Sequence, residues 1–290
     1  MKPAAFEYSR PSTLDEACAL LAADDGARLI AGGQTLVPLM AMRLARPTRL
    51  IDIARIPGLA YIRDGEDEVS IGATTRQCGV EGDPLVKTKL PLLARVMPYV
   101  GHTPTRARGT IGGSLANADP AAEIALVAVT LGATIVWRDG DKTDEADVSE
   151  FIVGPMVTSL PQAACLTEAR FPVWPDQRVG VGFHEVNARA SDFAFVSAAA
   201  QVALDADGRC ARVVLGIGAA TAFPIRIDAE ALIGGRAEER RVREVVDAAL
   251  TDVETMEDLH ASAGYRKRAA RTLAVRAIAD AYEDAHAHRA

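Results

Sequence analysis

The chain has 290 residues, of which 49% are hydrophobic and 24% charged, a composition that is typical of globular proteins and excludes a disordered or collagen-like chain. Its length exceeds that of one ordinary domain, so we expect two or three packed units. The formal net charge of −7 argues against a broad nucleic-acid surface, because such a surface needs clustered lysines and arginines, and we expect no nucleic-acid partner.

The first predicted unit, residues 1–56, contains a strand–helix–strand arrangement. In chain order we expect a helix over residues 13–23 capped by Ser12 or Thr13, a strand over 28–31, a helix over 36–45 and a strand over 49–53. Two adjacent glycines, Gly32 and Gly33, separate the first strand from the helix that follows it.

The second predicted unit, residues 57–175, mixes strands and helices. Its expected elements are an antiparallel hairpin of residues 61–63 and 69–73, a helix over 84–99 interrupted near Pro91, a helix over 121–131, and strands over 133–137, 151–153 and 164–171. The last strand runs into the sequence FPVWP, whose prolines cannot continue in a central sheet. We therefore expect a boundary at residue 175.

The third predicted unit, residues 176–290, begins with three strands over residues 181–186, 193–204 and 210–219. Helices follow from residue 229, and the longest is expected over residues 265–282. The whole pattern predicts an α+β fold.

The chain shows no signal for a membrane or for metal. No apolar run reaches the roughly 18 residues of a membrane span, and the N-terminal sequence MKPAAFEYSRP lacks the apolar centre of a signal peptide. We therefore expect a cytoplasmic protein. The 4 cysteines form no CxxC pair, so we expect no metal site in this chain.

Two segments share an unusual design and are named here the first glycine loop (residues 28–38, RLIAGGQTLVP) and the second glycine loop (residues 108–118, RGTIGGSLANA). Each has a glycine pair, a polar residue and then an apolar helical run. Glycine lets an anion approach backbone N–H groups closely, and a helix start adds unpaired N–H donors. Thr35 and Ser114 add hydroxyl donors, so both loops together predict a diphosphate site; the alternative is an ordinary tight turn in each.

Polar side chains follow the second glycine loop. Asn117, Asp119 and Glu123 are spaced to hydrogen-bond a ribityl or ribose chain, but Asn-x-Asp-Pro is equally typical of a capping turn, and both interpretations stay open. A rival sequence, VVLGIGAAT at residues 213–221, lacks the third glycine and the following helix of a dinucleotide fingerprint. Neither GxSxG nor a P-loop occurs, which excludes nucleophile-elbow and P-loop chemistry.

At these residues the sequence resembles the FAD-binding medium subunits of molybdenum hydroxylases, the family of the carbon monoxide and xanthine dehydrogenases. The motifs that carry the resemblance, in family order, are AGGQTLVPLMAMRLARP (31–47), RGTIGGSLANADPAAE (108–123), LTEARFP (166–172), SDFAFVSAAA (191–200) and SAGYRKRAARTLAVRA (262–277). They span nearly the whole chain.

The resemblance implies a two-lobed FAD-binding domain over residues 1–175, of the PCMH type, followed by a C-terminal α+β domain with a three-stranded antiparallel sheet and helices. It also implies which residues bind FAD. For the diphosphate and adenosine end these are Ala31, Gly32, Gly33, Gln34, Thr35, Leu36, Thr110, Ile111, Gly112, Gly113 and Ser114. For the ribityl or phosphate region they are Asn117 and Glu123, with Asp119 beside them, and Leu166 packs near the isoalloxazine.

The sequence departs from the family at several positions. Ala107 lies where many relatives have Asn, and Ser191 replaces a glycine that is common before the Asp-Phe pair. His184 stands where some relatives carry Lys, so it is either a flavin-side cation that depends on pH or an ordinary surface histidine.

The implied function is electron transfer. A large molybdenum-cofactor subunit oxidises the substrate, a small subunit with 2Fe–2S clusters carries the electrons, and FAD in this chain passes them to an external acceptor such as NAD, oxygen or a quinone. We therefore expect no catalytic acid or base here. The alternatives are a self-contained FAD-dependent oxidase or reductase and a scaffold subunit without flavin. The basic residues of 265–271 are either a docking surface or, as we prefer, a solvated helix face.

Overall fold

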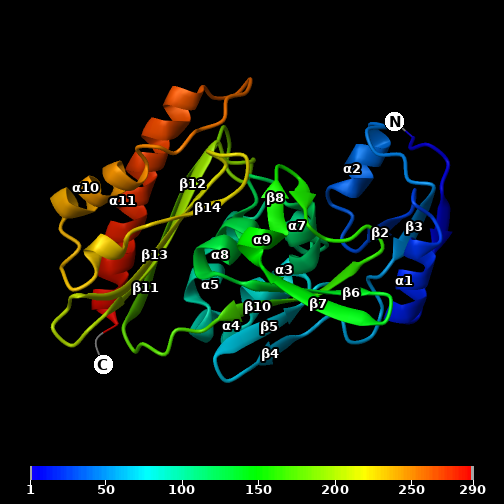
Figure 1. Cartoon of the computed structure of the whole chain (residues 1–290), viewed down its shortest axis with the longest axis horizontal. Helices are drawn as coiled ribbons and strands as arrows, with labels where there is room; N and C mark the ends of the chain where they lie inside the picture. Colours follow the sequence, from blue (N-terminus) through cyan, green and yellow to red (C-terminus); the bar gives the residue numbers. More distant parts are fainter. Residues whose placement is uncertain (1, 289–290) are drawn as a thin grey trace.

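A computed structural model describes residues 2–288. Three main sheets follow one another along the long axis of the molecule (Figure 1), and the fold is α+β as predicted. The predicted boundaries after residues 56 and 175 lie between the first and second sheets and between the second and third. Within residues 2–288, no helix is both long enough and apolar enough to cross a membrane.

The first sheet is parallel, with the strand order β1 (Glu7–Ser9), β3 (Arg49–Asp52), β2 (Arg28–Ile30). The predicted first helix is α1 (Leu14–Ala22), and Oγ1 of its N-cap Thr13 accepts a hydrogen bond from the N–H of Glu16 at 3.2 Å. Helix α2 (Leu36–Ala41) ends earlier than predicted, because Arg43 takes a left-handed conformation with φ of 61°.

The second sheet is antiparallel, with the strand order β4 (Ile62–Asp64), β5 (Glu68–Gly72), β10 (Cys165–Pro172), β6 (Thr134–Asp139), β7 (Lys142–Asp147). The predicted hairpin is β4–β5. Strand β7 was not predicted, because it is an exposed edge strand of the sequence KTDEAD without apolar alternation. The prediction for residues 151–153 is corrected by one residue: Phe151 ends helix α9 (Val148–Phe151), and the strand β8 (Ile152–Gly154) pairs with β9 (Val157–Thr158).

Helices cover one face of the second sheet. In chain order they are α3 (Gln77–Gly82), α4 (Pro84–Lys89), α5 (Pro91–Val96), α6 (Thr103–Arg106), α7 (Ile111–Asn117) and α8 (Glu123–Leu131). The predicted interruption near Pro91 separates α4 from α5, because proline begins a new helix there.

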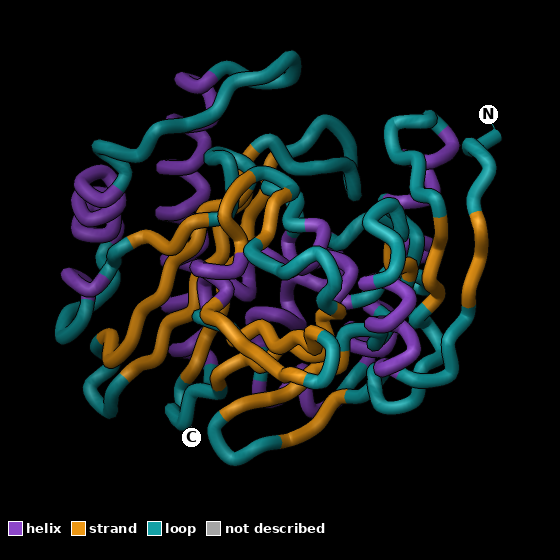
Figure 2. The backbone as a smooth tube through the Cα atoms, turned by 45° about the vertical axis from the view of Figure 1, so that its right-hand side comes forward, coloured by secondary structure: helices purple, strands orange, loops and turns teal. Residues whose placement is uncertain are grey.

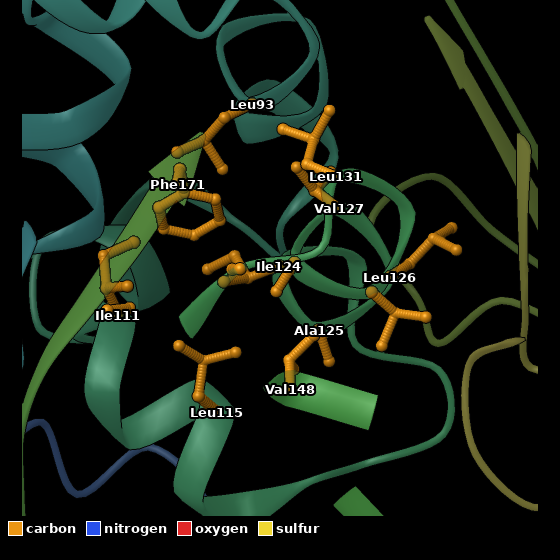
Figure 3. Packing of buried hydrophobic residues seen from close by; sticks show 14 of the residues in the cluster. Leu93, Ile111, Leu115, Ile124, Ala125, Leu126, Val127, Leu131, Val148 and Phe171 are labelled. Carbon is orange, nitrogen blue, oxygen red and sulfur yellow. The ribbon is translucent and has the colours of Figure 1, made fainter. Parts of the chain in front are cut away.

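Helix α8 is the centre of the molecule, since every one of its residues is buried. On one side it packs against Ile111 and Leu115 of α7 and against Phe171 of β10 (Figure 3). On the other side Leu126 faces the third sheet, where an added Cβ at Gly216 or Gly218 would meet the Leu126 side chain at 2.9 and 3.3 Å. A helix that is apolar all round is expected where two layers enclose it.

The third sheet is antiparallel and has the strands β11 (Val179–Val186), β12 (Val196–Leu204), β13 (Cys210–Gly218) and β14 (Ile225–Ile227). It therefore has four strands and not the three predicted. The fourth strand escaped prediction because it is a short edge strand that follows Pro224 directly. As predicted, the sequence VVLGIGAAT leads from β13 into a turn and not into a helix.

The two long C-terminal helices lie on the outer face of the third sheet (Figures 1 and 2); they are α10 (Glu239–Ala249) and α11 (Ala263–Ala287). Helix α11 touches β11 backbone to backbone. A Cβ at Gly182 would lie 2.0 Å from the carbonyl oxygen of Ala277, and one at Gly180 would lie 2.1 Å from the N–H nitrogen of Ala285. Glycine at these two positions is what permits the close packing.

Candidate functional site

The two glycine loops lie side by side. A Cβ added to Gly32 would stand 2.5 Å from the carbonyl oxygen of Arg108 and 2.9 Å from Cα of Gly109. Only a residue without a side chain allows this approach of the two backbones. The segments that the sequence analysis paired therefore lie against each other, although one follows a strand of the first sheet and the other belongs to the second predicted unit.

The first glycine loop has free backbone donors. Within residues 2–288, the N–H groups of Gly32, Gly33, Gln34 and Thr35 donate to no protein acceptor. Gly33 has φ of 68°, a conformation that glycine adopts without strain. The Gln34 side chain donates to the carbonyl of Gly32 at 3.1 Å, and Leu36 begins α2. Successive unpaired N–H groups of this kind suit an anion.

The second glycine loop is different, and here the expectation of unpaired N–H donors at the helix start is wrong. The N–H of Ile111 donates to the carbonyl of Thr75 at 3.1 Å, and that of Gly112 to the carbonyl of Ala73 at 2.9 Å. The N–H of Gly113 donates to Oγ1 of Thr110 at 3.1 Å, and that of Ser114 to the carbonyl oxygen of the same Thr110. The first two bonds tie α7 to the segment that follows β5, and the other two lie within its own N-terminal turn. The start of α7 therefore has no free backbone donor to offer to an anion.

Gly113 itself lies open. Apart from its chain neighbours and the backbone of α7, the only described heavy atom closer than 3.4 Å to a Cβ built on Gly113 is Oγ1 of Thr110 at 2.7 Å, whereas a Cβ on Gly112 would strike Ala73 at 2.5 Å. Gly112 is thus needed for packing of α7 on the strand β5. Gly113 faces the exposed side of the second glycine loop.

We predict that Gly113→Val weakens FAD binding by about tenfold, a loss of about 1.4 kcal/mol. The fold is expected to survive, because the close neighbour is the Thr110 hydroxyl, and its rotation costs no more than the one capping hydrogen bond that it accepts from the N–H of Gly113. Fluorescence titration with FAD measures the affinity. Gly79→Val, in α3, is the matched control: no described atom outside the backbone of that helix lies within 4 Å of its Cβ position, and it should bind as the wild type does. Equal affinity of Gly113→Val and wild type contradicts the prediction.

The turn between α7 and α8 carries the next predicted residues. Ala118 ends α7 with φ of 47°, and Oδ1 of Asp119 accepts a hydrogen bond from the N–H of Ala121 at 2.9 Å. Asp119 thus stabilises the turn before α8 through its side chain, as the capping-turn interpretation predicts. Asn117 lies half-buried in the last turn of α7. Contact of either residue with a flavin stays a prediction.

Glu123, the first residue of α8, is 8% exposed. Burial, together with smaller contributions from the neighbouring charges of Glu185 and Asp119, raises the pKa of its carboxyl to about 8. The carboxyl therefore holds a proton at neutral pH. A protonated carboxylic acid can donate a hydrogen bond as well as accept one.

Glu185 of β11 is a residue that the sequence analysis missed. Its Oε1 accepts a hydrogen bond from Nδ2 of Asn187 at 2.9 Å, while its Oε2 is buried without a partner among the described residues. Burial raises its pKa to about 7. Ser197, opposite Glu185 on β12, also has a buried Oγ without a partner in residues 2–288. Its position could have been found from the alternation of side chains along a strand. Val181 and Phe183 of β11 face the second unit, and Glu185 is the next residue on the same face.

His184 lies on the opposite face of β11. Its Nε2 is 2.9 Å from Oδ2 of Asp280 on α11, so the structure does not bring it together with Glu123. Leu166 is 4% exposed and belongs to the core around α7 and α8. For both residues, contact with the isoalloxazine stays a prediction.

Comparisons with known proteins agree over both parts of the chain. A family model described as "FAD binding domain in molybdopterin dehydrogenase" matches residues 4–174, and one described as "CO dehydrogenase flavoprotein C-terminal domain" matches residues 182–281. The 6-hydroxypseudooxynicotine dehydrogenase complex subunit alpha of Paenarthrobacter nicotinovorans is 35% identical, over 97% of this chain and 96% of its own. The carbon monoxide dehydrogenase medium chain of Hydrogenophaga pseudoflava is 33% identical, over 96% and 97%.

Solved structures give the same result. A chain of carbon monoxide dehydrogenase from Hydrogenophaga pseudoflava superimposes with a TM-score of 0.93 at 30% identity, covering 98% of this chain and 99% of that one. A chain of quinoline 2-oxidoreductase from Pseudomonas putida 86 gives a TM-score of 0.93 at 32% identity, covering 98% and 99%.

Proposed function

The chain belongs to the FAD-binding medium subunits of the molybdenum hydroxylases, and from this premise we propose that it takes electrons from iron–sulfur clusters of a partner subunit and delivers them through FAD to an external acceptor. It is thus the flavoprotein part of an oxidoreductase. The relatives named as medium chains or subunits of complexes support assembly with a large molybdenum-cofactor subunit and a small subunit with 2Fe–2S clusters.

The observation that carries the proposal is the contact of Gly32 with Arg108 beside the free N–H groups of the first glycine loop. Backbone N–H groups can bind a diphosphate without a lysine or arginine side chain, so an anion site of this kind is compatible with the acidic net charge of the protein. Bound FAD supplies the redox chemistry, since flavin accepts electrons singly or in pairs.

The chain's own residues bind and orient the cofactor. Gly32, Gly33, Gln34 and Thr35 would hold the diphosphate through their N–H groups, and the open face at Gly113 would leave it room. Glu123 would offer its proton as a hydrogen-bond donor from the start of α8. We also propose a cytoplasmic location, which is supported by the free thiols of all the described cysteines.

The test is reconstitution. The purified chain, stripped of flavin, should bind FAD and gain the visible absorbance of bound flavin, whereas riboflavin, which lacks the diphosphate, should bind far more weakly. A colourless protein that FAD cannot reconstitute refutes the proposal.

Isolation of the complex from its native source tests the second half of the proposal. Companion chains that carry molybdenum cofactor and 2Fe–2S clusters are expected. Substrate oxidation by the isolated chain would favour a self-contained oxidase or reductase instead.

A further inference from the structure

Arg266, in the first turn of α11, is a buried cation at the boundary of the second and third sheets. It is 3% exposed, and its Nη1 donates to the carbonyl oxygens of Phe195 at 2.5 Å and Ala219 at 2.6 Å. Its Nη2 donates to Oδ2 of Asp258 at 2.5 Å. A planar guanidinium can serve these three acceptors at once, which a lysine ammonium does not match in geometry.

Ala219 connects Arg266 to the FAD-binding unit. This residue follows β13 and has φ of 59°, a left-handed conformation that costs a non-glycine residue free energy. Its carbonyl accepts from Arg266, and its N–H donates to the carbonyl of Pro120 at 2.8 Å. The two peptide groups that flank the strained Ala219 are therefore both held by hydrogen bonds. One partner is Arg266 in the third unit, and the other is Pro120 in the second.

Pro120 lies in the turn that leads into α8, between Asp119 and Glu123. The neighbouring Ala220 is held as well, because its carbonyl accepts from the N–H of Met256 at 2.9 Å. A short series of hydrogen bonds thus runs from α11 through Ala219 to the turn that carries the proposed cofactor residues.

We propose that Arg266 is a positioning residue for FAD: it holds Ala219 in the conformation whose N–H fixes Pro120, and so sets the turn from which Glu123 meets the cofactor. This inference rests on the proposed function, because it concerns the same FAD site. It gives the C-terminal domain a part in cofactor binding through a residue that is itself buried among protein acceptors.

The test compares two arginine variants of the full chain. Arg266→Met is expected to raise the Kd for FAD about tenfold or more and to change the visible circular dichroism of the bound flavin, because the turn no longer has one orientation. Arg178→Met is the matched control: Nη1 of Arg178 donates to the carbonyl of Asp205 at 2.8 Å in the same domain but is not connected to Pro120. The control should keep the wild-type Kd and flavin spectrum, and thermal unfolding of both variants measures the stability that each has lost.

The outcomes are distinct. If the wild-type chain binds no FAD, the proposed function fails; if it binds FAD and folded Arg266→Met binds it equally well with an unchanged spectrum, the positioning role fails. Weakening by both variants in proportion to lost stability also overturns it. Should Arg266→Met not fold, Arg266→Lys keeps the charge beside Asp258 but not the two-carbonyl contact, and wild-type FAD affinity in that variant overturns the proposal.

Discussion

A Gly32→Ala chain is expected to lose FAD binding by about a hundredfold or more, a change of about 2.7 kcal/mol or more in binding free energy. One methyl group is enough, because its carbon would stand 2.5 Å from the carbonyl oxygen of Arg108 and 2.9 Å from Cα of Gly109. Both neighbours are backbone atoms that cannot rotate away. Arg108 is further fixed because its carbonyl accepts a hydrogen bond from Arg76. The two glycine loops must therefore separate, and the free N–H groups of the first loop move away from the second.

The control for this prediction is Gly79→Ala, which adds the same methyl group in α3 of the same predicted FAD-binding domain, where no described atom outside the backbone of that helix lies within 4 Å of the new carbon. It should bind FAD as the wild type does. Fluorescence titration gives the Kd of each variant, and circular dichroism checks that each is folded. Wild-type affinity in folded Gly32→Ala would show that contact between the loops is not needed for FAD.

The sequence predicted elements well where local chemistry decides them. Pro91 separates α4 from α5 because its ring forbids a continuous helix, and Thr13 caps α1 as its side chain allows. The edge strands β7 and β14 were missed because an edge strand needs no apolar alternation, and its pairing depends on a neighbour far away in the chain.

The sequence predicted where the site lies, but it did not predict which of the two glycine loops has free N–H donors. Glycine pairs identify both loops, yet the acceptors that occupy the N–H groups of Ile111 and Gly112 are carbonyls of Thr75 and Ala73, at the end of another strand. No pattern within the second glycine loop shows this. Likewise His184 was singled out because some relatives carry Lys at its position, whereas strand alternation turns its neighbour Glu185 to the opposite face of β11, toward the second unit.

The pair of Glu123 and Glu185 should make the apoprotein less stable as the pH rises. Their pKa values in the folded state are about 8 and about 7, against an ordinary value of 4.5, because both are buried. Between about pH 4.5 and pH 8, the folded chain thus binds more protons than the unfolded chain. Protonation therefore contributes stability fully below about pH 4.5, and this stability is lost as the pH rises through 7 and 8.

Glu123→Gln is expected to remove most of this loss, because a neutral amide of nearly the same shape needs no proton. At about pH 9 the variant should be more stable than the wild type by about 2 to 4 kcal/mol, whereas at about pH 5 the two should be nearly equal. Urea unfolding of the apoprotein across this range measures the difference. Glu150→Gln, which removes an exposed carboxylate from α9, is the control and should follow the wild-type pH dependence. If the stability of the wild type had the same pH dependence as that of Glu123→Gln, Glu123 would be ionised in the folded chain at neutral pH, and it would then have no proton to offer to a flavin.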